Sequence, residues 1–292
     1  LFRVWWNANF FSGYDPKLAL LAEVVEKQNK PGHVREKVVF QGKKGMKVPA
    51  LLHMPEGEGP FPCLVLLYGI GQDMDFADEI AEAYVQAGYA LFCPEQLGRG
   101  ERKNEVPREG LKALTSFKDR LSSTVVEARR AVDYLSSRAD IDSSNLTLWG
   151  VSLGAILGSS ALAMEPRYRQ GLLMWGGGDV TGMMTRNRLV RDNASRGQRF
   201  LAFLGAWFLA PAEPLLRIDQ IAPRPLLFQN ALQDEIIPRA CTEAYYSKAG
   251  EPKEILWYDC GHEKGLSLEL IQKIIQDQIA WLKRVGEGKQ AT

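Results

Sequence analysis

The chain of 292 residues carries 36 basic and 35 acidic side chains, so its formal net charge is only +1. A charge this close to zero, with no basic stripe along the chain, creates no field that would gather phosphates, and we expect no nucleic-acid partner. No stretch reaches the roughly 18 uninterrupted apolar residues that a membrane span needs, so none is expected.

From about residue 35 onward, short runs rich in leucine and β-branched residues alternate with segments of helical periodicity. This alternation is typical of βαβ units, so the sequence predicts an α/β fold with a mostly parallel sheet flanked by helices. Residues 37–40 and 48–54, separated by the turn-prone GKKG, are predicted to form an antiparallel hairpin. Six buried strands should follow, making eight in all: 62–68, 89–95, 146–150, 171–176, 224–230 and 254–258.

The predicted helices each have one apolar face. Leu121, Val125 and Val132 belong to a series that advances by three and four residues, as a helix packed on a sheet requires. Leu270, Ile274 and Leu282 belong to a second such series near the end of the chain. Both series are interpreted as core.

Residues 177 to about 216 separate two predicted strands by far more than a short loop and one helix. An apolar insertion at the carboxyl ends of parallel strands would lie where open α/β sheets bind ligands, so we interpret it as a cap over the site. The alternative is that its side chains only pack the insertion onto the body. Three of its residues, Met183, Phe203 and Trp207, are candidate substrate contacts.

The strongest motif is Gly150-Val151-Ser152-Leu153-Gly154, between a predicted strand and a helix of small residues. In a GxSxG motif the serine occupies a strained strand-to-helix turn, and the glycines leave room for it. The turn exposes the hydroxyl and directs the helix amino end at a developing oxyanion. Ser152 is therefore the candidate nucleophile, and a simple helix-capping serine would leave both glycines unexplained.

A serine hydroxyl needs a neighbouring base, and the chain has only three histidines. His33 precedes the predicted sheet and His53 lies in the first hairpin. His262 follows the last strand in the segment DCGHE, where this arrangement places its base at the carboxyl edge of the sheet. His262 is therefore the candidate base.

The acid that orients such a histidine is expected between the serine and the histidine in chain order. Asp234 follows the strand RPLLFQN and is the main candidate, whereas the adjacent Glu235 would point elsewhere. Asp179, which follows the preceding strand, is the rival. A helix-capping role is the alternative for both aspartates.

Tyr68-Gly69-Ile70-Gly71 ends the third predicted strand, where an oxyanion loop is expected. Glycines let the backbone approach a substrate closely, so the backbone N–H groups of Ile70 and Leu153 are predicted to bind the oxyanion. Tyr68 is a further candidate substrate contact. An ordinary glycine turn is the alternative.

The segments YGIGQD, GVSLG, LQDEIIP and CGH, in this order, resemble the α/β-hydrolase superfamily, in particular its dienelactone-hydrolase and acetyl-xylan-esterase-like branch. Two departures matter. The common oxyanion motif of the family begins with histidine, whereas Tyr68 stands there in this chain. Dienelactone hydrolases proper carry cysteine at the nucleophile position, so Ser152 favours ester cleavage instead.

The resemblance implies a serine carboxylesterase with a small-molecule ester as its partner and no metal or organic cofactor, and the compact apolar cap favours short to medium acyl groups. It implies an N-terminal extension over residues 1–34, a catalytic domain over 35–285 and a tail over 286–292. The alternatives are a peptidase similar to prolyl oligopeptidase, whose large preceding propeller would not fit in about 35 residues, and a hydrolase-fold protein that binds without turnover.

The four cysteines, at positions 63, 93, 241 and 260, form no CxxC pair and are too sparse for a disulfide scaffold. Buried thiols are expected, which favours a cytoplasmic location. Residues 1–11 do not resemble a signal-peptide core. A secreted form from which a leader peptide was already removed is the alternative. The sequence carries no prediction of oligomeric state.

Overall fold

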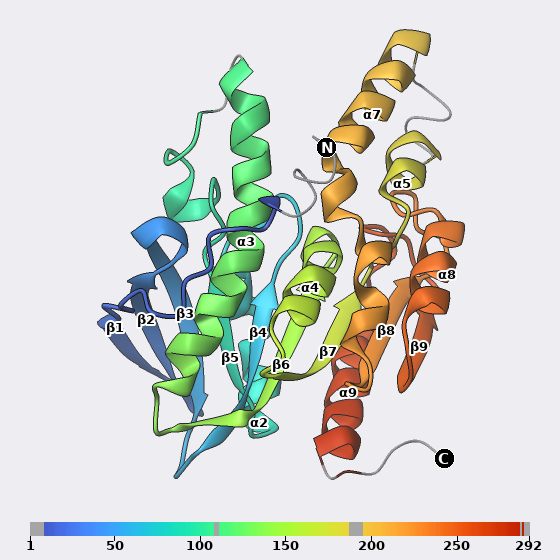
Figure 1. Ribbon diagram of the computed structural model, residues 1–292. Helices are drawn as coiled ribbons and strands as arrows, with labels where there is room; N and C mark the ends of the chain where they lie inside the picture. The colour runs from blue at the N-terminus through green and yellow to red at the C-terminus, as the bar shows by residue number, and fades with distance from the viewer. Residues whose placement is uncertain (1–8, 108–110, 187–194, 287, 289–292) are drawn as a thin grey trace.

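The computed structural model describes residues 9–107, 111–186, 195–286 and 288, and its centre is a twisted sheet with helices on both faces (Figure 1). The nine strands lie in the order β1-β2-β3-β5-β4-β6-β7-β8-β9. The pairs β1–β2, β2–β3 and β3–β5 are antiparallel, and all other pairs are parallel. The strands are β1 (Glu23–Lys30), β2 (His33–Gln41), β3 (Lys47–Pro55), β4 (Phe61–Leu67), β5 (Ala90–Pro94), β6 (Ile141–Val151), β7 (Tyr168–Met174), β8 (Leu226–Ala231) and β9 (Lys253–Tyr258).

The predicted α/β class is confirmed, but the predicted strand number is one too few. Strand β1 lies inside the predicted N-terminal extension and pairs antiparallel with β2. Its sequence EVVEKQNK is almost entirely exposed, so it lacks the apolar alternation by which the other strands were predicted. A short charged strand at a sheet edge also discourages pairing with other chains.

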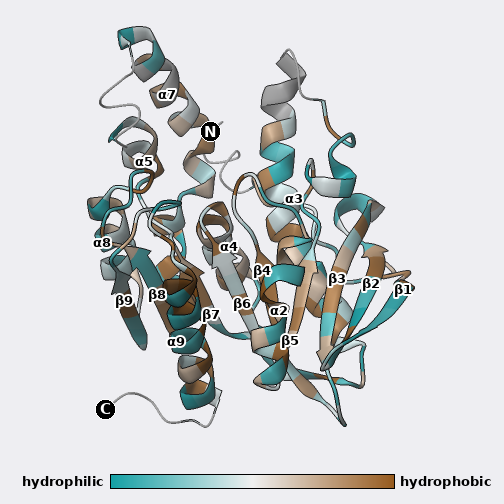
Figure 2. Cartoon of the chain, turned by 180° about the vertical axis from the view of Figure 1, so that it is seen from behind, coloured by the Kyte–Doolittle hydropathy of each residue, from teal (hydrophilic) through white to brown (hydrophobic). Residues whose placement is uncertain are grey.

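Helices cover the two faces of the sheet in separate sets. Figure 1 shows α3, α4 and α8 in front of the sheet, and Figure 2, from behind, shows α2 and α9 on the opposite face. Each set encloses one main apolar cluster, and the brown strands between the layers in Figure 2 mark where the core lies. The helices are α2 (Phe76–Gln86), α3 (Leu111–Ser136), α4 (Leu153–Met164), α8 (Arg239–Lys248) and α9 (Leu268–Gly286).

The predicted apolar series lie in these layers. Val125 and Val132 of α3 are completely buried in the front cluster, and Ile274 and Leu282 of α9 are buried in the rear one. The expectation of buried thiols is also confirmed, because all four cysteines are free and buried.

The order of the strands reverses at β4, which determines where a site can form. The chain runs from β4 to β5 on one side of it and then to β6 on the other side. In open α/β sheets, ligands bind outside the carboxyl ends of the strands at such a switch point. The loops that follow β4 and β6 therefore meet there.

Two helices of the predicted cap, α5 (Val180–Arg186) and α7 (Arg196–Leu209), project above the carboxyl edge of the sheet (Figure 1). The 3-10 turns that follow, η3 (Ala210–Ala212) and η4 (Pro214–Leu216), instead pack against α4 on the front face of the sheet. Residues 187–194 of the predicted cap lie outside the described residues.

One stretch of this region, Arg196–Ile221, is long and apolar enough to cross a membrane by length and composition alone, with a mean hydropathy of 1.3. The expectation that no segment would qualify is therefore not met by that criterion. The stretch is not one regular helix, because the α-helix ends at Leu209 and only short 3-10 turns continue it to Ile221. A bilayer core needs about 20 helical residues, so α7 alone is too short to span it.

Candidate active site

Ser152 lies at a sharp turn between β6 and α4, as predicted. Its backbone angles, φ 54° and ψ −116°, are rare for any residue other than glycine. Its N–H donates to the carbonyl of Met174 at 2.8 Å. A Cβ on Gly150 would lie 2.4 Å from the carbonyl oxygen of Gly154, so position 150 admits only glycine without movement. The close packing around the turn keeps the serine in this strained conformation.

Replacing Gly154 with alanine should destabilise the fold strongly. A Cβ there would lie 1.8 Å from the carbonyl oxygen of Leu67, and backbone cannot move aside as a side chain can. We expect a loss above about 3 kcal/mol in the free energy of unfolding, beyond the usual range for overpacking. Urea denaturation measures it, with Gly197→Ala as control because nothing lies within 4 Å of that position. Equal stability of the two variants would contradict the tight turn.

The structure brings Ser152, His262 and Asp234 together in one hydrogen-bonded chain. The hydroxyl oxygen of Ser152 lies 2.9 Å from Nε2 of His262, and Nδ1 of His262 lies 2.8 Å from Oδ2 of Asp234. The other oxygen of Asp234 accepts the backbone N–H groups of Ile236 and Ile237 at 2.8 and 2.6 Å. Both oxygens of the carboxylate are thus hydrogen-bonded, which fixes its orientation toward the imidazole.

Glu235 holds the loop that carries the histidine, a role that the sequence did not suggest. Its Oε2 accepts the backbone N–H of His262 at 3.0 Å. Burial acts to raise the pKa of Glu235, but the hydrogen bonds from backbone N–H groups, the first of them His262's, and the nearby Lys264 outweigh it and lower that pKa. The only signal in the sequence was the position of Glu235 beside Asp234. Adjacent side chains point in different directions, so Glu235 was expected to point elsewhere.

Asp179 does not contact His262, so the geometry favours Asp234 over this rival as the acid. Its carboxylate binds the guanidinium of Arg186 and accepts the N–H of Gly182 at 2.9 Å. Asp179 therefore performs the helix-capping role that was its alternative interpretation, at the start of α5.

The loop after β4 lies directly against the serine. A Cβ on Gly69 would come within 3.2 Å of Cβ of Ser152, and the N–H of Gly69 donates to Oε1 of Gln72 at 3.2 Å, which braces the loop. Among the described residues, none accepts a hydrogen bond from the N–H of Ile70. Leu153 is the first residue of α4, so its N–H has no acceptor within the helix. The two predicted oxyanion donors are thus free for a ligand.

Tyr68 is not a substrate contact, because its side chain is completely buried. Its hydroxyl donates to Glu95 and accepts the N–H of Gln96 at 2.7 Å. Side chains alternate along a strand, and Tyr68 continues the series of Leu64 and Leu66 into the rear core. The prediction placed the residue correctly in the loop but not the direction of its side chain.

The three candidate contacts in the cap differ in their surroundings. Met183 is only 7% exposed and packs in a small cluster with Val180, Ile237 and Cys241, so its role is mainly packing. Phe203 and Trp207 are 52% and 51% exposed. Together with Phe200 and Leu204 they form a stripe along one side of α7, at the spacing of one helical face. About half of each of these two aromatic side chains is therefore left uncovered by packing onto the body.

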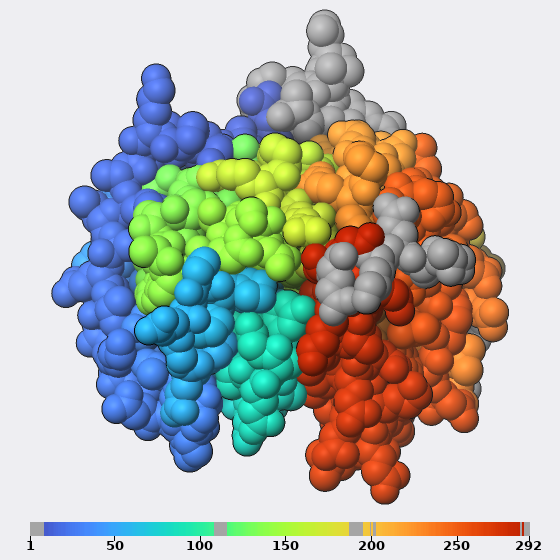
Figure 3. All heavy atoms as spheres, turned by 90° about the horizontal axis from the view of Figure 1, so that it is seen from below, coloured from blue at the N-terminus to red at the C-terminus, as the bar shows by residue number. Residues whose placement is uncertain are grey.

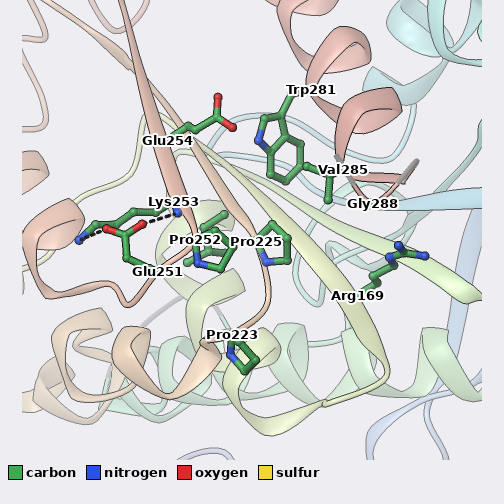
Figure 4. A pocket seen from close by; sticks show the side chains of 11 residues that line it. Arg169, Pro223, Pro225, Glu251, Pro252, Lys253, Glu254, Trp281, Val285 and Gly288 are labelled. Atoms are coloured by element: carbon green, nitrogen blue, oxygen red, sulfur yellow. Dashed lines mark hydrogen bonds and ion pairs between the residues drawn. The ribbon is translucent and has the colours of Figure 1, made fainter. Parts of the chain in front are cut away.

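A cavity of about 290 Å³ lies far from the serine, at the amino ends of the parallel strands. It lies between the starts of β7, β8 and β9 and the end of α9, with Arg169, Lys253 and Trp281 among the side chains in Figure 4. Figure 3 shows this lower end of the molecule, where α9 in red lies beside the orange segments. The cavity contains none of the predicted site residues.

A polar hollow of about 440 Å³ begins instead at the oxyanion loop, lined by Gln72, Asp73, Glu95 and Glu101 among others. Its carboxylates do not form a metal site: within the described ranges, no group of three or more potential ligands could hold a metal ion.

Comparisons with known proteins identify the family and the fold of the chain. Residues 48–263 match the Dienelactone hydrolase family. Esterase YjfP of Escherichia coli (strain K12) is 24% identical over 195 residues, which are 65% of this chain and 76% of that protein. Two solved acetyl xylan esterases each cover 96% of this chain and 93% of their own: the enzyme from Paenibacillus sp. R4 (TM-score 0.74, 20% identity) and that from Thermoanaerobacterium sp. JW/SL YS485 (TM-score 0.71, 18% identity). At such identity the structural likeness establishes the fold.

Proposed function

Because the chain belongs to the dienelactone hydrolase family, we propose that it is a serine carboxylesterase that cleaves short to medium acyl esters through an acyl-enzyme. The observation that carries the proposal is the hydrogen-bonded chain from the hydroxyl of Ser152 through His262 to Asp234. The names of the relatives, an esterase and two acetyl xylan esterases, support ester bonds as the substrate class.

In the first half-reaction Ser152 attacks the acyl carbon while Nε2 of His262 takes the hydroxyl proton. The serine Oγ–C bond forms, the carbonyl π electrons move to oxygen, and the N–H groups of Ile70 and Leu153 stabilise that oxyanion. The tetrahedral intermediate collapses as His262 returns the proton to the leaving alcohol oxygen. Asp234 holds the imidazole in the tautomer that has its free lone pair on Nε2.

In the second half-reaction water takes the place of the alcohol. His262 removes a proton from the water as its oxygen attacks the acyl carbon, and the same N–H groups stabilise the second oxyanion. When the bond to Ser152 breaks, His262 gives the proton back to the serine oxygen and the carboxylic acid leaves. No step requires a metal or an organic cofactor.

We propose that the cap contributes to the choice of acyl group through the exposed aromatic side chains of α7. Phe203 and Trp207 belong to α7, which projects above the carboxyl edge of the sheet (Figure 1), and roughly half of each side chain is exposed and could contact a ligand. A buried acyl chain would gain about 0.8 kcal/mol for each CH₂ removed from water. A longer acyl chain should therefore depend more on these side chains.

Trimming Phe203 or Trp207 to alanine should change the preferred acyl length. We expect the ratio of kcat/KM between acetate, butyrate and octanoate esters to change by roughly tenfold per methylene-sized mismatch. Labelling of Ser152 by a small phosphonate should stay unchanged. A lower Tm with a flat chain-length profile would show that the two side chains only pack.

A panel that varies acyl and alcohol groups separately tests the proposed activity as a whole. Purified enzyme is expected to hydrolyse acetate and butyrate esters of simple alcohols and to leave short peptide amides intact. Cleavage of peptides with little ester hydrolysis would favour the peptidase alternative. Absence of both activities would favour a protein that binds without turnover.

A further inference from the structure

The ring of Trp175 lies beside the imidazole of His262, whose two nitrogens are hydrogen-bonded to Ser152 and Asp234. The residue directly follows β7, and its ring centroid lies 5.8 Å from that of His262 with an interplanar angle of 41°. Its backbone N–H donates to the carbonyl of Gln229 at 2.7 Å, which anchors the residue to the neighbouring strand β8. The indole therefore contacts His262 from a residue whose backbone is hydrogen-bonded to the sheet.

The backbone of Trp175 is strained at this position. Its φ is 52°, in the left-handed region that bulky side chains avoid. Strain of this kind persists where the surrounding structure imposes it, and it is concentrated at functional sites. The three glycines that follow, residues 176–178, would adopt such a conformation more easily, yet the tryptophan occupies it.

A second unfavourable feature accompanies the strain. The indole Nε1 is buried, and it has no hydrogen-bond partner among the described residues. A buried donor without an acceptor costs free energy that phenylalanine would not incur. Hydrogen bonding therefore does not explain why tryptophan stands here, whereas contact of its ring with the imidazole does.

We propose that Trp175 is a positioning residue that keeps the His262 ring between Ser152 and Asp234 and stabilises its protonated form through the contact of the indole with the imidazole. An electron-rich ring within about 6 Å attracts a cation, and tryptophan does so most strongly. His262 becomes a cation in both half-reactions, so the indole would stabilise the imidazolium at the stage when the imidazole carries the proton taken from serine or water. The catalytic part of this inference rests on the proposed function, whereas the effect on the protonation of His262 does not.

Other charged groups also act on this imidazole, so the contribution of Trp175 must be measured against them. Asp234 and Glu235 approach from the loop after β8, at Nδ1 and at the backbone N–H. Asp259, Glu263 and Lys264 lie on the loop of His262 itself. None of these groups changes when Trp175 is replaced.

The test is an NMR titration of the three histidines in the wild type and in Trp175→Leu, with His262→Asn to assign the resonance. Loss of the indole should lower the pKa of His262 by about half a unit, the size of a cation–π contact. Burial lowers the pKa of His53 to about 4, and its titration should not move, because its contacts with His33 and Asp78 are unchanged. The acidic limb of kcat/KM should shift to lower pH by the same amount, and kcat should fall about two- to fivefold with KM unchanged.

Trp257→Leu is the matched control, because Arg239 lies over the ring of Trp257 at 5.1 Å but His262 does not. It should leave the titration and the pH profile unchanged. Trp175→Phe should shift the pKa of His262 less than Trp175→Leu, and Trp175→Met replaces the leucine variant if that variant does not fold. An unmoved or raised pKa in the folded variants would overturn the inference, even if the enzyme is an esterase. A lowered pKa in an enzyme without ester turnover would instead contradict the proposed function alone.

Discussion

Replacing Ser152 with alanine is expected to abolish ester turnover, with kcat lower by on the order of a millionfold. The substitution removes the only oxygen that lies at hydrogen-bond distance from Nε2 of His262 within the described structure. Alanine in the strained turn should leave the fold nearly unchanged, because it keeps the Cβ of serine and lacks only the hydroxyl oxygen. Initial rates on a butyrate ester, together with a thermal melt, measure both effects.

Ser160→Ala is the matched control for this substitution. Ser160 lies on α4, the helix that begins beside Ser152, and its buried hydroxyl has no hydrogen-bond partner among the described residues. Its loss should leave kcat within about twofold of the wild type, because only packing changes. If the alanine variant at 152 retained most of the activity, the assigned nucleophile would be wrong.

Asp234→Asn is expected to lower kcat by about 10⁴-fold with little effect on stability. The asparagine amide can present a donor to Nδ1 of His262, which favours the tautomer with its proton on Nε2, where it cannot accept one from serine. The side-chain oxygen that accepts two backbone N–H groups can be retained, so the loop should keep its shape. Steady-state kinetics across a pH series measure the loss.

Asp179→Asn should leave kcat nearly unchanged, because that carboxylate binds Arg186 and the N–H of Gly182 instead of the histidine. A small loss of stability is expected as the ion pair is weakened. If Asp179→Asn were the crippling change and Asp234→Asn the mild one, the assignment of the acid would fail.

Sequence periodicity and local motifs were sufficient for the parts of this protein that follow local rules. Buried parallel strands appear as short apolar runs, and all eight runs named from the sequence correspond to strands. The GxSxG turn and the order of serine, acid and histidine indicated three side chains that the structure brings together from distant parts of the chain. These signals were readable because each depends on a few neighbouring residues.

The features that the sequence did not predict depend on tertiary packing. Strand β1 is polar and exposed, and only pairing with β2 makes it a strand. The hydroxyl of Tyr68 can be buried only because Glu95 and Gln96, which belong to another segment, supply its hydrogen bonds. Likewise Glu235 and Trp175 acquire their contacts with His262 only when the loops after β7, β8 and β9 meet.

The central claim is that Ser152 is an activated nucleophile, and covalent labelling with a fluorophosphonate tests it most directly. The wild-type enzyme should react to one label per chain, and peptide mass spectrometry should place the phosphorus on Ser152. Prior replacement of His262 by alanine should slow that reaction strongly, because the base that activates the hydroxyl is lost. A wild-type protein that remains unlabelled, or one labelled on a different residue, would contradict the account.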